Sequence, residues 1–251
     1  MKHTERSVAQ MPVSSILWDY DGTLADSSKK NIEVTLDILR HFIPDVDENV
    51  PEILASRTSY HDAYGRIYDW KELYRTCYGL DEEQIRRAGA MWGEAQLKNT
   101  RCSDIFPGIA EILAAFSHIP MGICSQNGAE IILRSLHSHG IEKYFGSIIG
   151  YDDVPFDGQK PAPDAFFACL DRLGISERNR RFVYIGDHSV DVAFGKNAES
   201  VLKKDFPKAE VICVAIHHPG LYSEDDPRFL PDFTANNSEE LFAVLKKLDE
   251  E

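Results

Sequence analysis

Acidic residues directly follow two short apolar runs of the sequence, in patterns that suit one shared site. Asp19 and Asp21 stand two residues apart after the run that begins at Val13. Asp187 and Asp191 stand four residues apart after a second run. Parallel strands bring their carboxyl ends to one edge of a sheet, so these side chains are expected to meet there. Two unit charges ~4 Å apart repel by about 4 kcal/mol at an effective dielectric of 20, which calls for a cation. An all-oxygen ligand set favours Mg²⁺ over zinc.

Two further segments supply groups that suit a phosphoryl anion. Ser125 follows an apolar run and precedes a helix pattern, so its hydroxyl and the free amide hydrogens of a helix N-terminus form a potential anion site. Lys160 stands in KPAPD, where the prolines restrict the backbone around it. Together with a divalent ion, Ser125 and Lys160 predict a positive socket for a phosphoryl group.

Each of these features also has an ordinary interpretation when it is taken singly. The first acidic pair suits a plain acidic turn, and Ser125 suits a helix cap. Asp187 and Asp191 also suit helix capping, and Lys160 suits a surface lysine in a proline-rich turn. The combination is more specific than any single feature, because all four segments are expected at the same edge of one sheet.

The elements that must position these residues alternate between strand and helix patterns. Strands are expected at 13–19, 120–124, 146–150, 181–185 and 211–216. Helices are expected at 109–117, 128–139, 164–173, 190–198 and 238–248. This alternation predicts an α/β fold with a Rossmann-like, doubly wound parallel sheet covered on both faces. Only helical spacing occurs between about 28 and 99, which predicts an all-helical insertion after the first strand. The expected domains are an α/β core of residues 1–26 and 101–251 and a helical domain of residues 27–100.

Charge and hydropathy exclude several classes of partner. The chain has 27 basic and 41 acidic residues, a net charge of −14, which disfavours binding to nucleic acid or to acidic lipids. No apolar run approaches the ~20 residues that span a bilayer, and the N-terminal segment lacks the apolar stretch of a signal peptide. We therefore expect a cytoplasmic protein that does not bind membranes. The oligomeric state stays open.

Four segments, DYDGT, CSQN, KPAPD and GDHSVD, occur in an order and spacing that resemble the haloacid dehalogenase-like (HAD) phosphohydrolase superfamily. The resemblance covers nearly the whole chain from Val13 onward. The helical insertion is similar to the C1-type cap of phosphoglycolate phosphatase and β-phosphoglucomutase relatives. The resemblance implies a HAD core with a C1 cap, and a Mg²⁺-dependent phosphohydrolase that acts on a small phosphorylated metabolite through a phosphoaspartate.

The resemblance also implies a role for each matching residue. Asp19 is the expected nucleophile and Asp21 the expected general acid/base. Ser125 and Gln126 are expected to bind phosphoryl oxygens, and Lys160 to neutralise the nucleophile and the phosphate. The implied metal ligands are Asp19, Asp21 through its backbone carbonyl, Asp187 and Asp191, the last either directly or through water.

The sequence departs from the family pattern in three places. Gln126 stands where an asparagine is usual, and His188 follows the motif aspartate. The stretch 198–210 is longer than the usual link to the last strand. Beyond that strand, His217 and His218 are close enough in sequence to approach the site, but a histidine pair in a loop is more often solvated, and this is the interpretation favoured here.

Several side chains of the helical insertion are candidates for contact with the leaving group. Most of them are expected on a solvated helix face, with one or two meeting the substrate. These candidates are Arg57, Arg66, Lys71 and Arg75, together with His61 and Tyr64.

Other functions are compatible with part of this pattern. A sugar phosphomutase uses the same residues, and a non-catalytic binding protein remains an alternative that the acid/base Asp21 disfavours. A dehalogenase is disfavoured by Asp21 and the metal carboxylates. A signalling receiver also uses an aspartate, a hydroxyl, a lysine and Mg²⁺, but lacks the early pair of aspartates and the inserted helices.

Overall fold

The computed structural model describes residues 11–67, 70–219 and 230–250, and its centre is one parallel sheet. The strands are β1 (Val13–Trp18), β4 (Met121–Cys124), β5 (Phe145–Ile149), β6 (Arg181–Gly186), β7 (Glu210–Ile216) and β8 (Phe233–Ala235). Their order is β5-β4-β1-β6-β7-β8, with every pair parallel. The predicted α/β fold with a doubly wound parallel sheet is confirmed. Since β1 lies between β4 and β6, the segments that follow these three strands are neighbours at one edge.

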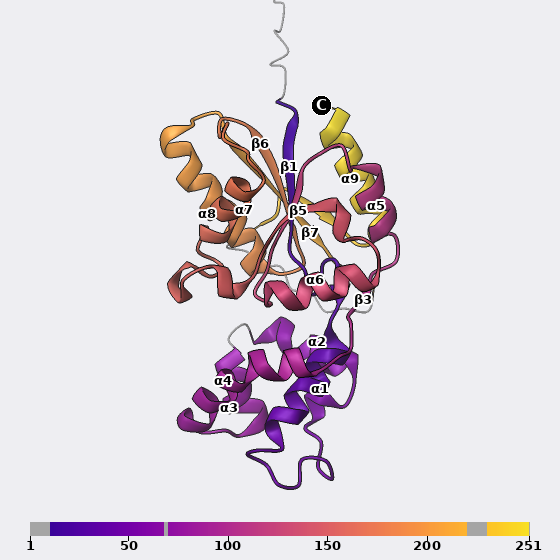
Figure 1. The fold of residues 1–251 in the computed structure, drawn as a ribbon, viewed down its shortest axis with the longest axis vertical. Coiled ribbons are helices and arrows are strands. Elements are labelled where there is room, and N and C mark those ends of the chain that lie inside the picture. The colour runs from indigo at the N-terminus through magenta and orange to yellow at the C-terminus, as the bar shows by residue number, and fades with distance from the viewer. Residues whose placement is uncertain (1–10, 68–69, 220–229, 251) are drawn as a thin grey trace, which may run out of the picture.

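Each face of the sheet has its own apolar core, because side chains alternate along a strand. On β1, Ile16 and Trp18 belong to one core and Leu17 belongs to the other. The first face is covered by α5 (Ile109–Ala115), α6 (Ala129–Ser138) and α9 (Ser238–Glu250). The second is covered by α7 (Asp164–Arg172) and α8 (Ser189–Asp205). Figure 1 shows α7 and α8 on the opposite side of the strands from α5 and α9. No helix in the described part of the chain is long and apolar enough to cross a membrane.

Of the α-helices described between β1 and β4, the first four form a separate layer beyond the carboxyl ends of the strands (Figure 1). They are α1 (Ser28–Leu39), α2 (Arg57–Arg66), α3 (Trp70–Tyr78) and α4 (Glu82–Lys98). This helical layer has an apolar core of its own, which includes Val34, Leu73 and Ile85. We call these helices and their connections the cap.

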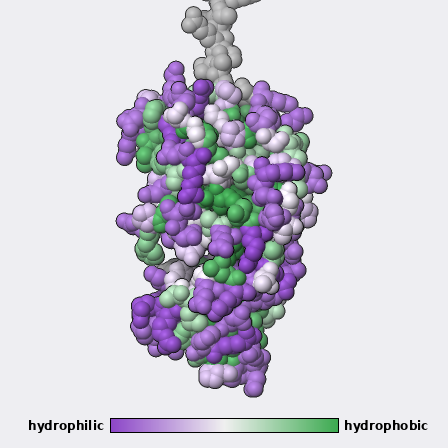
Figure 2. All heavy atoms as spheres, in the orientation of Figure 1, coloured by the Kyte–Doolittle hydropathy of each residue, from purple (hydrophilic) through white to green (hydrophobic). Residues whose placement is uncertain are grey.

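The cap leaves and rejoins the sheet domain at one narrow connection. There β2 (Ala25–Asp26) pairs antiparallel with β3 (Asp104–Ile105). Figure 2 shows a mainly hydrophilic surface with apolar side chains gathered near the middle of this face. Exposed apolar residues of the two parts include Leu97, near the end of α4, and Leu133, on α6.

Two local features differ from the sequence expectations. The helix predicted at 190–198 continues to Asp205, because Ala198 and Leu202 extend its buried stripe at a spacing of four residues. The long link expected after 198 is therefore mostly helix. The strands β2, β3 and β8 have only two or three residues each, which is too short for periodicity to reveal them.

The extended end of α8 gives a stability prediction. Leu202 is 2% exposed, whereas its neighbour Val201 is 39% exposed. Leu202→Ala leaves a cavity and is expected to lower the free energy of unfolding by about 2–5 kcal/mol. Val201→Ala is the matched control, with an expected change within about 0.5 kcal/mol. Urea denaturation of both variants measures the difference, and equal losses would contradict the packing described here.

Candidate active site

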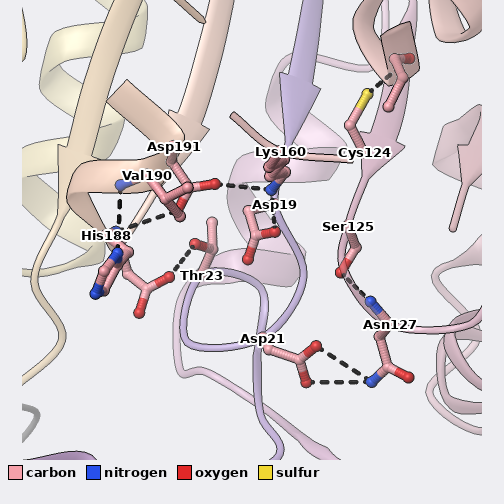
Figure 3. A network of polar contacts seen from close by, with 12 residues as sticks. Asp19, Asp21, Thr23, Cys124, Ser125, Asn127, Lys160, His188, Val190 and Asp191 are labelled. Atoms are coloured by element: carbon pink, nitrogen blue, oxygen red, sulfur yellow. Dashed lines mark hydrogen bonds and ion pairs between the residues drawn. The ribbon is translucent and has the colours of Figure 1, made fainter. Parts of the chain in front are cut away.

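A buried lysine lies between two aspartates at the carboxyl edge of the sheet (Figure 3). Lys160 Nζ donates to Asp19 Oδ1 at 2.5 Å and to Asp191 Oδ1 at 2.7 Å. All three residues are buried. Burial disfavours the charged lysine, but the charges of Asp19 and Asp191 outweigh it and raise the pKa of Lys160 above its usual value. The alternative of a solvated surface lysine is wrong.

The position of Asp191 is fixed by contacts on both of its oxygens. Oδ1 also accepts from the Tyr184 hydroxyl at 3.2 Å, and Oδ2 accepts from the His188 backbone N–H at 3.2 Å. Gly186, at the end of β6, permits this close approach, since a Cβ there would lie 2.3 Å from Asp191 Cβ. Both oxygens of the Asp191 carboxylate are therefore hydrogen-bonded to other groups of the protein.

Asp187 packs against the loop that follows β1. The Thr23 hydroxyl donates to Asp187 Oδ1 at 3.1 Å. Gly22 has a φ of +79°, and a Cβ there would lie 2.1 Å from Asp187 Oδ2. The glycine supplies both the left-handed turn and the space that the carboxylate occupies.

Three carboxylates gather closely enough to hold one metal ion. Asp19, Asp187 and Asp191 each offer an oxygen, and these atoms lie within 4.8 Å of one another. Burial, with the neighbouring charge of Asp191, raises the pKa of Asp187 to about 8. Burial also raises the pKa of Asp19, despite the opposing charge of Lys160. The raised pKa values show that these carboxyl groups are difficult to ionise together without a nearby positive charge. A divalent cation that prefers oxygen ligands, such as Mg²⁺, would supply that charge.

The Asp21 side chain lies apart from this cluster and points toward Asn127, in the loop that follows β4 (Figure 3). Its two oxygens accept from Asn127 Nδ2 at 3.2 and 3.3 Å. Burial raises the pKa of Asp21, and the neighbouring polar groups of Ser27 and Asn127 oppose that shift. A carboxyl with a raised pKa is suited to give and take a proton.

The loop after β4 turns one predicted residue inward and one outward. Ser125 is buried, and its hydroxyl accepts from the Asn127 backbone N–H at 3.2 Å. Gln126 is exposed to solvent. Asn127 is buried, holds Asp21 and accepts from the Gly128 backbone N–H at 2.8 Å. The sequence interpretation missed Asn127, whose only sequence signal is its place at the start of a helix.

The basic candidates on the cap have different surroundings. Arg57 pairs with the buried carboxylate of Asp26, at the connection between cap and core. Arg75 pairs with the cap's own Glu72 and Glu82, so it belongs to the solvated face. Arg66 is exposed.

Lys71 reaches from the cap to an aromatic ring of the core. Its Nζ lies 5.8 Å from the centre of the Trp70 ring and 5.5 Å from that of Phe156. The remaining two candidates are more enclosed. His61 Nε2 is buried, and burial lowers the pKa of His61 to about 4. The ring centre of Tyr64 lies 4.3 Å from that of Tyr60.

His218 is buried, so its interpretation as a solvated loop residue is wrong. Its Nε2–H donates to the Thr23 carbonyl at 2.8 Å, and its ring stacks 3.6 Å from that of Phe106. Burial lowers the pKa of His218, which keeps the imidazole neutral near pH 7. This histidine supports the loop that carries Asp21 and Thr23.

The family model of haloacid dehalogenase-like hydrolases matches residues 16–201. The chain belongs to this family. It is 26% identical to pyrophosphatase PpaX of Listeria monocytogenes over 244 residues. The aligned region covers 95% of this chain and 98% of that protein. It is 25% identical over 205 residues to phosphoglycolate phosphatase of Escherichia coli, covering 74% of this chain and 78% of that protein.

Solved structures share the HAD chain's fold at lower identity. A haloacid dehalogenase-like family hydrolase from Streptococcus pneumoniae superposes with a TM-score of 0.65 and 19% identity, covering 93% of this chain and 98% of that one. A mutant of CbbY from Rhodobacter sphaeroides, in complex with xylulose-1,5-bisphosphate, gives a TM-score of 0.60 and 18% identity, covering 91% and 96%. These likenesses confirm the HAD fold.

The close approach of Gly22 to Asp187 gives a prediction with a matched control. Gly22→Ala and Gly174→Ala both place a side chain at a positive φ, which costs about 1–2 kcal/mol. A Cβ at Gly174 meets nothing within 4 Å, whereas a Cβ at Gly22 displaces Asp187. We expect both variants to lower Tm, and only Gly22→Ala to reduce the Tm increase that Mg²⁺ causes. Thermal unfolding with and without Mg²⁺ measures this; equal Mg²⁺ responses would argue against Asp187 as a ligand.

The raised pKa of Asp187 predicts a pH-dependent response to metal. Without a divalent ion, the protonated Asp187 stabilises the folded state because its pKa is higher there than in the unfolded chain. This stabilisation is fully present below about pH 4 and is lost as the pH rises towards about 8. Mg²⁺ binds the ionised carboxylate, so it competes with the proton. The Tm increase at fixed Mg²⁺ is therefore expected to be larger at about pH 8 than at about pH 6. A response that is flat or falls over this range would contradict the assignment.

Proposed function

We propose that this HAD chain is a Mg²⁺-dependent phosphatase that hydrolyses a small phosphorylated metabolite through a phosphoaspartate on Asp19. The observation that carries the proposal is the buried Asp19 carboxylate, held 2.5 Å from Lys160 beside Asp187 and Asp191. The names of the relatives, a pyrophosphatase and a phosphoglycolate phosphatase, support phosphoryl-group hydrolysis.

Asp19 and Asp187 are the proposed side-chain ligands of the metal, together with the backbone carbonyl of Asp21. The acidic cluster includes Asp191, but both of its oxygens already accept hydrogen bonds from protein groups. We therefore assign Asp191 mainly to the orientation of Lys160. When bound, Mg²⁺ supplies positive charge that offsets the charge of the phosphoryl oxygens.

The proposed first step forms a phosphoaspartate. An Asp19 oxygen attacks phosphorus, and the bond from phosphorus to the leaving oxygen breaks. The carboxylic acid of Asp21 gives its proton to that oxygen, a role that its raised pKa supports. Lys160 and the Ser125 hydroxyl are the proposed contacts of the phosphoryl oxygens.

The proposed second step reverses the proton transfer. The ionised Asp21 takes a proton from a water molecule, whose oxygen attacks the phosphorus of the acyl phosphate. The bond from phosphorus to Asp19 breaks, which releases inorganic phosphate and restores both carboxyl groups. A sugar phosphomutase would return the phosphoryl group to a sugar hydroxyl instead. Release of inorganic phosphate, measured over a set of phosphorylated metabolites with and without Mg²⁺, distinguishes the two activities.

Substitution of the two aspartates after β1 separates their proposed roles. Asp19→Asn removes the nucleophile, so neither turnover nor a labelled protein is expected. Asp21→Asn keeps the nucleophile, and nitrophenyl phosphate has a leaving group that needs no protonation. Since general acid/base catalysis contributes about 10²–10⁴-fold, hydrolysis slows and one phosphoryl group accumulates on Asp21→Asn. Rapid quench with intact mass spectrometry detects the added group.

The wild-type protein is the reference for both variants. It is expected to turn over nitrophenyl phosphate with little labelled protein at steady state. Labelling of Asp19→Asn to the same extent as Asp21→Asn, or turnover by Asp19→Asn, would refute the covalent role of Asp19.

A further inference from the structure

His218, the second residue after β7, joins two segments that lie far from it in the sequence. Its Nε2–H donates to the backbone carbonyl of Thr23 at 2.8 Å. Its ring stacks on that of Phe106, with the ring centres 3.6 Å apart and the planes 12° apart. Thr23 lies in the loop that follows β1, and Phe106 directly follows β3, where the chain returns from the cap. The imidazole therefore connects the loop after β1 with the return from the cap.

The two stacked residues hold successive carbonyls of the same loop. His218 bonds the Thr23 carbonyl, and the Phe106 backbone N–H bonds the Leu24 carbonyl at 3.1 Å. Thr23 is fully buried, so its carbonyl needs a partner within the protein. In the described part of the chain, His218 is the only donor to this carbonyl. Removal of that donor leaves a buried acceptor without a partner, which favours a shift of Thr23.

The side chain of Thr23 meets the acidic cluster on the other side. Its hydroxyl donates to Asp187 Oδ1 at 3.1 Å (Figure 3). Thr23 thus lies between His218, which holds its backbone, and Asp187, which its hydroxyl contacts. A hydrogen bond to one oxygen of a carboxylate fixes the direction in which the other oxygen points. The placement of Thr23 therefore influences how Asp187 faces the rest of the cluster.

Stability alone would also account for a buried, hydrogen-bonded histidine. That explanation predicts that every substitution of His218 lowers stability and that the metal site is unaffected in the protein that remains folded. The contacts described here predict more, because the N–H at the edge of the ring and the face of the ring have different partners. These two contacts can be removed one at a time.

We propose that His218 is a positioning residue that holds Thr23 in place and, through the Thr23 hydroxyl, orients Asp187 towards the metal. The proposal rests on the function proposed above, in which Asp187 is a ligand of Mg²⁺. In this role His218 acts through Thr23 and not by contact with the metal or the substrate.

Two substitutions separate the hydrogen bond of His218 from its stacking. In glutamine, Nε2 lies as many bonds from Cα as in histidine, so His218→Gln keeps a donor for the Thr23 carbonyl and loses the ring. His218→Phe keeps a ring that stacks on Phe106 and has no donor. Leu202→Ala, near the C-terminal end of α8, is the control for a loss of stability away from the site.

The first measurement is the dissociation constant for Mg²⁺, obtained by calorimetric titration. His218→Phe is expected to raise it by on the order of tenfold, the lower end of the loss that follows removal of a hydrogen bond behind a metal ligand. His218→Gln and Leu202→Ala are expected to stay close to the wild-type value. A wild-type value in His218→Phe, or an equal loss in His218→Gln, would overturn the proposal.

A further variant covers the case in which His218→Phe does not fold. His218→Asn carries the same amide as His218→Gln, but one bond closer to Cα, so its N–H falls short of the Thr23 carbonyl. It is expected to weaken Mg²⁺ binding as His218→Phe does, and equal affinities of His218→Asn and His218→Gln would contradict the role of the hydrogen bond.

A double-mutant cycle tests whether His218 acts through Thr23. Thr23→Val removes the hydroxyl that contacts Asp187 and keeps the shape of the side chain. In the Thr23→Val background, His218→Phe is expected to have no further effect on Mg²⁺ affinity, since the route to Asp187 is already broken. Losses that add in the double variant would show that His218 acts by another route.

Crystal structures of the metal-free variants give an answer that needs neither Mg²⁺ nor activity. The contact between the Thr23 hydroxyl and Asp187 is expected to be lost in His218→Phe and kept in His218→Gln. Its retention in His218→Phe would refute the positioning role. A wild-type protein that neither binds Mg²⁺ nor releases phosphate would refute the proposed function, while these structures still decide whether His218 positions Thr23 and Asp187.

Discussion

The ammonium of Lys160 is buried between the carboxylates of Asp19 and Asp191. A buried charge is tolerated only when it is paired, and removal of one partner from such a pair typically costs about 3–5 kcal/mol. Asp187 adds a third carboxylate to the cluster, so one ammonium faces three acidic groups. When all are ionised, 1 − 3 leaves a net charge of −2 among these four residues. A divalent cation is the simplest complement to that charge. The raised pKa of Asp187 reflects its burial and, after that, the charge of Asp191.

The sheet makes this arrangement of charges possible. With β1 in the interior, between β4 and β6, the segments after these strands share one edge. Two apolar cores hold the strand from both faces, so the loop after β1 starts from a fixed point. At that edge, Gly22 and Gly186 leave no side chain where Asp187 and Asp191 lie. The rigidity of the cores and the absence of a Cβ at two positions together determine the distances in the site.

The cap has its own apolar core and is connected to the sheet domain by the short β2/β3 pair. The described contacts between the cap and the core include hydrogen bonds and a cation–ring contact. Arg134 holds the end of α4 through backbone carbonyls, and Lys71 reaches the Phe156 ring. In the proposed function, these contacts hold the cap over the substrate site.

The sequence by itself determined the features that local patterns encode. Apolar runs predicted the five longer strands, and helical spacing predicted the insertion. The positions directly after the strands pointed to Asp19, Ser125, Asp187 and Asp191. Only the tertiary structure decided the contacts between residues far apart in the chain. Asn127 meets Asp21 across 106 positions and His218 meets Thr23 across 195, and neither contact leaves a periodic signal. The burial of Lys160 was likewise invisible in KPAPD, because burial depends on which other elements close over a turn.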